Sequence, residues 1–361
     1  MKQKIKPIFF TLIAIILVFG VFETGTRLIK LLQGDALKKV GEKTLAFQVE
    51  DLQPYVFFRS LPSLELRPHG DFFFDFNGKT VKHEKKNGEY RIFILGGSVA
   101  KGFGSSSPDK AYHQILEALL NEGAQRSEGR PYNVVSAGRL GYVSAQELIL
   151  LQMGILEFKP DLVIHLNGAN DILTVTQYQE PPGYPFYHQS LKRSLQAVKI
   201  NKAINQTITK SAFLSELEAM FKKYRKSEPG VTTFNIDRHY RRNMTQSAQL
   251  LKANDIPGLI VLQPLLLEKK QLAGHEVTSI KKLSQNNRHI WLSTFNKLAV
   301  SLKEISEKTG ILWKNFQGVF DNQQEETFGD TIHLNDRGQR LLAKALLPIV
   351  KDFLKSHKKM N

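Results

Sequence analysis

The sequence has no cysteine in its 361 residues. Disulfide bonds, thiol catalysis and thiolate metal sites are therefore excluded, although the absence leaves the cellular compartment open. A second absence concerns nucleic acids. The formal net charge is +16, yet no zinc-ligand spacing, RNP-like run or basic-heptad pattern accompanies it. We therefore expect no nucleic-acid partner, and we interpret the basic excess as a solvated surface or as attraction to anionic lipid headgroups or acidic glycans.

Long apolar runs are also scarce, and only residues 7–22 approach the length of a membrane span. This stretch is uncharged, mostly apolar and preceded by Lys2, Lys4 and Lys6. It is slightly shorter than the roughly 20 residues that cross a bilayer, and no small-x-small cleavage site follows it. We favour an uncleaved signal anchor over a cleaved signal peptide. The three lysines predict a cytoplasmic N-terminus and a single-pass protein whose remainder is extracytoplasmic, although basic residues also follow the stretch.

A short apolar strand ending in glycine and serine opens the main domain. Ile92–Leu95 is followed by Gly96-Gly97-Ser98, which indicates a buried strand that stops at a tight turn. Because open α/β sheets bind ligands at the carboxyl ends of their strands, the Ser98 hydroxyl is well placed for chemistry. Taken alone, this pattern also fits an ordinary βα turn with a helix-capping serine.

Strand and helix patterns then alternate along the chain, as a parallel sheet requires. Two further apolar runs end in Gly138-Arg-Leu-Gly141 and in Gly168-Ala-Asn-Asp171, and Asp330-Thr-Ile-His333 precedes the last helix. We predict an α/β protein with a parallel sheet of about five strands and helices between them. We divide the chain into three parts. Residues 1–23 form a cytoplasmic stub and the anchor, and residues 24–90 form a juxtamembrane helix and an N-terminal extension with a hairpin near 71–78. Residues 91–356 form the main domain.

Four of these blocks, in their order and spacing, resemble the SGNH, or GDSL, hydrolases, a superfamily of serine esterases and acyltransferases. The resemblance covers about Arg91 to Asp352 and implies a three-layer α/β/α sandwich. It implies that Ser98 is the nucleophile, that Asp330 and His333 complete a catalytic triad, and that the oxyanion hole is formed by Ser98, Gly141 and Asn170. The usual Gly-Asp-Ser appears here as Gly96-Gly97-Ser98. The missing aspartate is not a reacting group, so we expect the chemistry to survive in a divergent branch.

These residue types suit acyl transfer. A serine hydroxyl needs a positioned base, and a histidine held in one tautomer by a carboxylate is such a base. Asp321 and Asp336 also lie near the last block, but neither has the spacing of Asp330. We interpret His165 as a core or rim residue and Asp171 as a possible cap of the next turn. We expect no cofactor and no metal, since only Asp330 and His333 show ligand-like spacing.

A basic, partly helical insert over residues 172–237 departs from a minimal domain. It starts directly after Asn170-Asp171 and opens with a Pro/Tyr/Phe-rich stretch, so it could be a lid, a membrane-contacting surface or a solvated excursion.

We predict a membrane-anchored serine esterase that acts on an acyl ester, with an O-acylated carbohydrate of the cell envelope as substrate. Three alternatives remain open: an O-acyltransferase that uses the same triad on a polysaccharide, a lipid esterase, and a non-catalytic envelope assembly protein.

Overall fold

The computed structural model describes residues 16–26, 73–76, 79–122, 131–178, 180–186 and 236–358. The chain divides into two units, Met1–Gln48 with Tyr187–Gly230, and Val49–Phe186 with Val231–Asn361. In the first unit the described part is a helix over residues 16–26, most of whose side chains are exposed. Residues 7–15 of the expected anchor and 187–235 of the insert lie outside the described residues. Among the helices that are described, none combines the length and the apolar character needed to span a bilayer.

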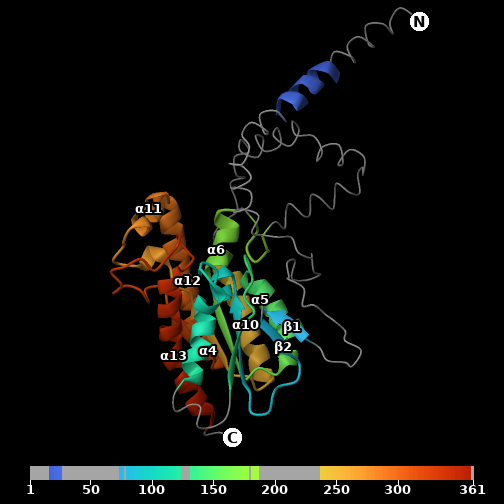
Figure 1. Ribbon diagram of the computed structural model, residues 1–361, viewed down its shortest axis with the longest axis vertical. Coiled ribbons are helices and arrows are strands. Elements are labelled where there is room, and N and C mark those ends of the chain that lie inside the picture. The colour runs from blue at the N-terminus through green and yellow to red at the C-terminus, as the bar shows by residue number, and fades with distance from the viewer. Residues whose placement is uncertain are drawn as a thin grey trace, which may run out of the picture. The chain divides into compact units, whose positions relative to one another are not determined.

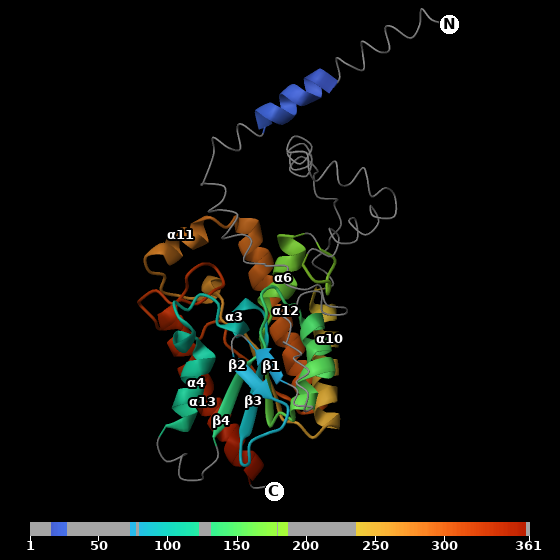
Figure 2. The same cartoon turned by 45° about the vertical axis from the view of Figure 1, so that its right-hand side comes forward.

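The second unit contains a five-stranded parallel sheet with the strand order β4-β3-β5-β6-β7. Figure 2 labels the neighbouring strands β3 and β4. The strands are β3 (Tyr90–Gly96), β4 (Tyr132–Ser136), β5 (Leu162–Asn167), β6 (Gly258–Leu262) and β7 (Leu312–Asn315). Strand β5 is buried along its whole length and β3 almost so, as continuous apolar runs predict for a sheet covered on both faces. The predicted sheet is therefore confirmed.

The strand order places a switch point at β3. The chain moves from β3 to its neighbour β4 on one side and then returns to β5 on the other side. The connection that follows β3 and the connection that follows β5 therefore diverge to opposite faces of the sheet. This divergence leaves a crevice at the carboxyl ends of the strands, where α/β proteins bind their ligands.

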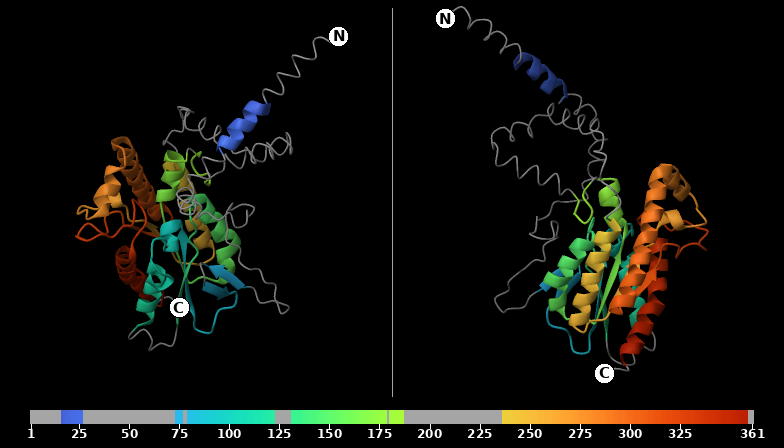
Figure 3. Two further views of the ribbon diagram at one scale, coloured as in Figure 1. Left: turned by 45° about the horizontal axis from the view of Figure 1, so that its top comes forward. Right: turned by 180° about the vertical axis from the view of Figure 1, so that it is seen from behind.

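Helices cover both faces of the sheet (Figures 1 and 3). On one face α13 packs against α4, and on the other α10 packs between α5 and α12. Their bounds are α4 (Tyr112–Asn121), α5 (Ser144–Leu150), α10 (Ile236–Ala253), α12 (Gln285–Thr309) and α13 (Asp336–Lys358). Both ends of the expected insert belong to the sandwich, because Ile172–Thr176 completes helix α6 (Ala169–Thr176) and Ile236 begins α10.

One predicted helix is less regular than expected. The apolar spacing of Leu148, Leu151 and Ile155 predicts one helix over residues 144–158. Only Ser144–Leu150 is α-helical, followed by a π turn at Leu151–Ile155 and a 3₁₀ turn at Leu156–Phe158. Lys159 then adopts a left-handed φ of 49° before Pro160. Gly154 inside this segment weakens the regular helix, and the proline stops it.

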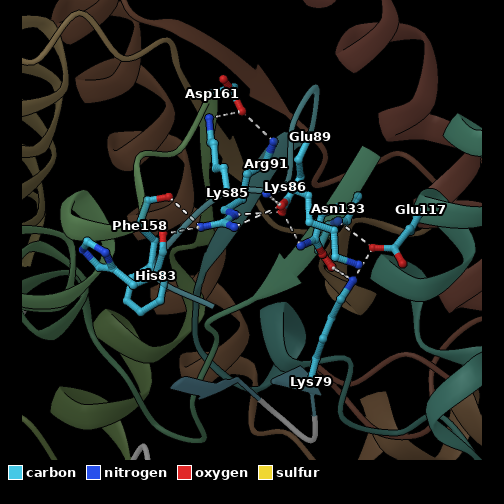
Figure 4. A network of polar contacts seen from close by, with 11 residues as sticks. Lys79, His83, Lys85, Lys86, Glu89, Arg91, Glu117, Asn133, Phe158 and Asp161 are labelled. Atoms are coloured by element: carbon cyan, nitrogen blue, oxygen red, sulfur yellow. Dashed lines mark hydrogen bonds and ion pairs between the residues drawn. The ribbon is translucent and has the colours of Figure 1, made fainter. Parts of the chain in front are cut away.

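A hairpin near the start of the second unit binds the amino end of the sheet. Strands β1 (Phe73–Phe76) and β2 (Lys79–Lys82) pair in antiparallel fashion, which confirms the predicted hairpin. The Lys79 ammonium contacts the Glu117 carboxylate on α4 and donates to the carbonyl of Val134 on β4 at 3.1 Å (Figure 4).

Buried charges continue this network at the start of β3 (Figure 4). The Arg91 side chain is 1% exposed, pairs with Glu89 at 2.9 Å and donates to the carbonyl of Phe158 at 2.9 Å. Burial alone would raise the pKa of Glu89, but hydrogen bonds from Arg91, Asn133 and the Lys86 N–H outweigh it and lower that pKa to about 2. The amino end of the sheet is therefore closed by ion pairs, and the opposite end is left for the site.

Candidate active site

The turn after β3 sets the direction of the Ser98 side chain. Gly96 has φ 147°, and a Cβ there would overlap the carbonyl oxygen of Leu166 on the neighbouring strand, so both conformation and space require glycine. Helix α3 (Ser98–Lys101) starts at the next residue but one. The Ser98 side chain therefore lies at the carboxyl edge of the sheet, at the switch point.

Ser98, His333 and Asp330 form one hydrogen-bonded series. His333 Nε2 lies 2.8 Å from Ser98 Oγ, and His333 Nδ1 lies 2.6 Å from Asp330 Oδ2. The other carboxylate oxygen, Oδ1, accepts from the backbone N–H groups of Ile332 and His333 at 2.8 Å each. Such a series allows the histidine to remove the serine proton while the carboxylate holds the ring.

Hydrogen bonding keeps Asp330 ionised. Desolvation by the surrounding chain raises the pKa of this partly exposed carboxyl, but the hydrogen bond and charge of His333, together with two backbone donors, outweigh it and hold the pKa below its usual value. The two neighbouring carboxylates have other partners: Asp336 accepts from Ser106, and Asp321 pairs with Lys270. The carboxylate that lies against His333 is therefore the one three residues before it, as the spacing predicts.

A buried ion pair supports the loop that carries Asp330 and His333. The loop is narrow, since Phe328 and Leu334 form a β-bridge and Gly329 N–H donates to the His333 carbonyl at 2.7 Å. At its base, Glu276 accepts from the N–H of Thr327 at 2.7 Å and of Phe328 at 3.1 Å.

Glu276 also accepts from a buried lysine, Lys269. Lys269 Nζ lies 2.7 Å from Glu276, and both side chains are at most 1% exposed. Glu276 lies on α11 (His275–Lys281), a helix that the sequence analysis missed. A lone glutamate in a polar stretch is indistinguishable by sequence from a solvated one, so no signal could have identified it.

The residues expected in the oxyanion hole meet beside Ser98. Gly141 has φ 74°, and Asn170 Nδ2 donates to the carbonyl of Tyr142 at 2.9 Å. A Cβ built on Gly97 would touch both Asn170 and that carbonyl, which places Asn170 and Tyr142, the neighbour of Gly141, beside the residue that precedes Ser98. The backbone N–H groups of Ser98 and Gly141 donate to no other group in the described part of the chain. The oxyanion roles of these residues stay a prediction.

Asp171, expected as a possible cap of the next turn, instead binds the first residue of α5. It accepts from the N–H of Ser144 at 3.1 Å and from its hydroxyl at 2.5 Å, and Ser144 is the first residue of α5. Full burial, assisted by the nearby charge of Glu147, raises the pKa of Asp171 to about 7. The Asn170-Asp171 pair therefore fastens the loop that contains Gly141.

The interpretation of His165 as a core residue is confirmed. Its side chain is fully buried, and Nδ1 lies 2.8 Å from Glu147 on α5. Asn167 also donates to Glu147 at 2.6 Å and accepts from Tyr240 at 2.7 Å. This polar cluster joins β5 to α5 and α10 and is separate from the Ser98 series.

Phe103 is a residue near the site that the sequence did not reveal. Its ring lies edge-on to His333 with centroids 4.8 Å apart, and its side chain is 41% exposed. An apolar ring in this position can border the bound acyl ester. As for metals, the described ranges contain no gathering of three His, Asp or Glu side chains that could hold an ion.

A parallel α/β sandwich with a serine, a histidine and an aspartate in hydrogen-bonded series at its carboxyl edge has the architecture of a serine hydrolase. The sequence profile of the GDSL-like Lipase/Acylhydrolase family matches residues 94–341. The match covers more than half of the chain, so the protein belongs to this family of carboxylic ester hydrolases. No curated protein matches the sequence significantly.

Several solved structures are similar to this chain at low identity. One is an acetyl xylan esterase with 13% identity and a TM-score of 0.45, covering 72% of this chain and 99% of its own. An α/β hydrolase from the metagenome of Lake Arreo, Spain, has 15% identity and a TM-score of 0.44, covering 72% and 94%. A catalytic mutant of an acetylxylan esterase from Geobacillus stearothermophilus has 14% identity and a TM-score of 0.45, covering 72% and 93%. Likenesses this distant say nothing about the substrate of the present chain.

Proposed function

We propose that the protein hydrolyses an acyl ester through an acyl-enzyme formed on Ser98, with His333 as the base and Asp330 as its orienting carboxylate. The observation that carries the proposal is the position of His333, with one ring nitrogen 2.8 Å from Ser98 Oγ and the other 2.6 Å from Asp330. A base within this distance can remove the serine proton, and a carboxylate on the far nitrogen fixes the required tautomer.

The reaction proceeds in two halves. Ser98 Oγ attacks the ester carbonyl while His333 Nε2 takes its proton, and the same nitrogen then returns the proton to the departing alcohol. Water, activated by His333, attacks the acyl-enzyme and releases the acid. In each half the oxyanion is stabilised by the N–H groups of Ser98 and Gly141 and by the Asn170 amide. Removal of one such donor typically costs about 3–4 kcal/mol of transition-state stabilisation.

We further propose that the substrate is an O-acylated carbohydrate of the cell envelope and that the protein is anchored in a membrane with its catalytic domain outside the cytoplasm. The support is the uncharged run of residues 7–22 after three lysines, together with the exposed apolar side chains of the helix over 16–26, including Leu17, Val21 and Phe22. Exposed apolar side chains on a helix of this kind are suited to lipid. A separate experiment tests the anchor: the full chain should remain with membranes after a high-salt wash and be released only by detergent.

The chemistry is tested by labelling the full chain with a fluorophosphonate probe and locating the adduct by mass spectrometry. We expect one adduct, on Ser98, that is absent from Ser98→Ala and from His333→Ala. A folded protein that takes no label, or takes it on another serine, refutes the mechanism. Product analysis with a polysaccharide acceptor then separates hydrolysis from acyl transfer, since a hydrolase releases only free acid.

A further inference from the structure

Gly97 stands where the family motif carries aspartate, and in this chain the space beside its Cα is already filled. The backbone at Gly97 has φ −85° and ψ −147°. Because φ is negative, no left-handed conformation requires glycine here. What requires glycine is space. A Cβ on Gly97 would overlap the side-chain nitrogen of Asn170 and approach its Cγ to 3.1 Å. The Asn170 amide therefore occupies the volume that a side chain at position 97 would fill.

The amide cannot move aside freely, because it is held from the other direction. Asn170 Nδ2 donates to the carbonyl of Tyr142 at 2.9 Å, and the Asn170 side chain is 8% exposed. An amide group carries two hydrogens on its nitrogen. One is used by Tyr142, which leaves the other for a second acceptor, such as the oxyanion of the proposed reaction. Any displacement of the amide by a new Cβ would disturb both donations together.

The geometry points to Gly97 as a positioning residue for the oxyanion donor Asn170: the missing side chain is what lets the amide lie against the backbone next to the nucleophile. This inference rests on the proposed function. It also reverses a simple expectation, because restoring the family's aspartate at position 97 should impair this enzyme.

A double-mutant cycle tests the inference on the full chain. We expect Gly97→Ala to lower kcat for 4-nitrophenyl acetate about 10²-fold, the loss typical of one oxyanion donor, with KM changed less than about 3-fold. Gly97→Asp should lose at least as much. In Asn170→Ala the overlapping atoms are absent, so adding Gly97→Ala should cost no further activity. Non-additivity of this kind is the signature of two residues in direct contact.

Thermal unfolding supplies a readout that does not depend on catalysis. Gly97→Ala should lower the melting temperature of the wild type but not that of Asn170→Ala. If the single variant fails to fold, the double variant should fold. An equal loss of kcat or melting temperature in both backgrounds, or no loss in either, overturns the inference. If the wild type shows no esterase activity, the proposed function fails, and the melting temperatures still decide whether Gly97 makes room for Asn170.

Discussion

Asp330→Asn should be more damaging than Asp330→Ala, although asparagine is the closer replacement. In Asp330→Asn the side-chain oxygen can keep the two 2.8 Å bonds from the N–H groups of Ile332 and His333. The amide nitrogen is then left facing His333 Nδ1, where the carboxylate oxygen lay at 2.6 Å. Because that nitrogen donates, Nδ1 must accept, and the ring proton moves to Nε2. A histidine in this tautomer cannot take the proton of Ser98.

The loss of activity should therefore be much larger for Asp330→Asn than for Asp330→Ala. A wrong tautomer in another serine hydrolase lowers kcat by about 10⁴-fold. Alanine leaves Nδ1 open to water, because the Asp330 side chain is 54% exposed. Asp330→Ala should then lose about as much transition-state stabilisation as one hydrogen bond to a charged group supplies. That is about 1.5–3 kcal/mol, or about 10–150-fold in rate.

The assay is kcat/KM on 4-nitrophenyl acetate at pH 7.5 for both variants, with His333→Ala as the floor. Asp336→Asn is the matched control, since Asp336 bonds to Ser106 and Lys110 rather than to His333. We expect it to change kcat/KM less than about 3-fold, the size of a surface ion pair. Equal losses for the two Asp330 variants, or a larger loss for alanine, would refute the tautomer argument.

Two further predictions concern stability as a function of pH. Glu89→Gln should lower the free energy of unfolding by about 3 kcal/mol at pH 7, because the buried Arg91 loses its charged partner. Since the folded pKa of Glu89 is about 2 against an ordinary 4.5, this contribution is present above pH 4.5 and lost as pH falls toward 2. Urea titrations at pH 7, 4 and 3 should show the difference shrinking, and a constant difference would contradict this. The pKa of Asp171 is raised from 3.8 to about 7, so its contribution is full below pH 3.8 and disappears as pH rises through 7. The stability of Asp171→Asn relative to wild type should therefore rise between pH 5 and 8, and a flat profile would rule this out.

The sheet was predictable because its strands carry their own signal. The run Ile92–Leu95 is fully buried, as four consecutive apolar residues before a glycine turn imply. The pair of Asp330 and His333 was equally accessible, because residues three apart on a tight loop can face one site. In both cases the residues that carry the signal lie within a few positions of one another in the sequence.

What could not be predicted depends on partners that are distant in sequence. Glu147 is fully buried because His165 and Asn167 from β5 meet it, and the helix that carries it gives no hint of this. Glu276 is likewise buried against Lys269 and against backbone N–H groups that are distant in sequence. Thr327, for example, is 51 positions away. Periodicity describes which face of an element is apolar, and it says nothing about polar groups that are paired across elements.

The separation between Ser98 and His333, 235 positions along the chain, has a consequence for the order of events during synthesis. Strands β3, β4 and β5 and the serine turn are complete well before the ribosome reaches the loop with Asp330. Chains fold from the N-terminus as they emerge, so a nascent or truncated chain would present the serine without its base. Ester cleavage would then be the last property acquired, after β7 has joined the sheet and α13 has docked on α4. A chain released from the ribosome before His333 is made would not cleave acyl esters.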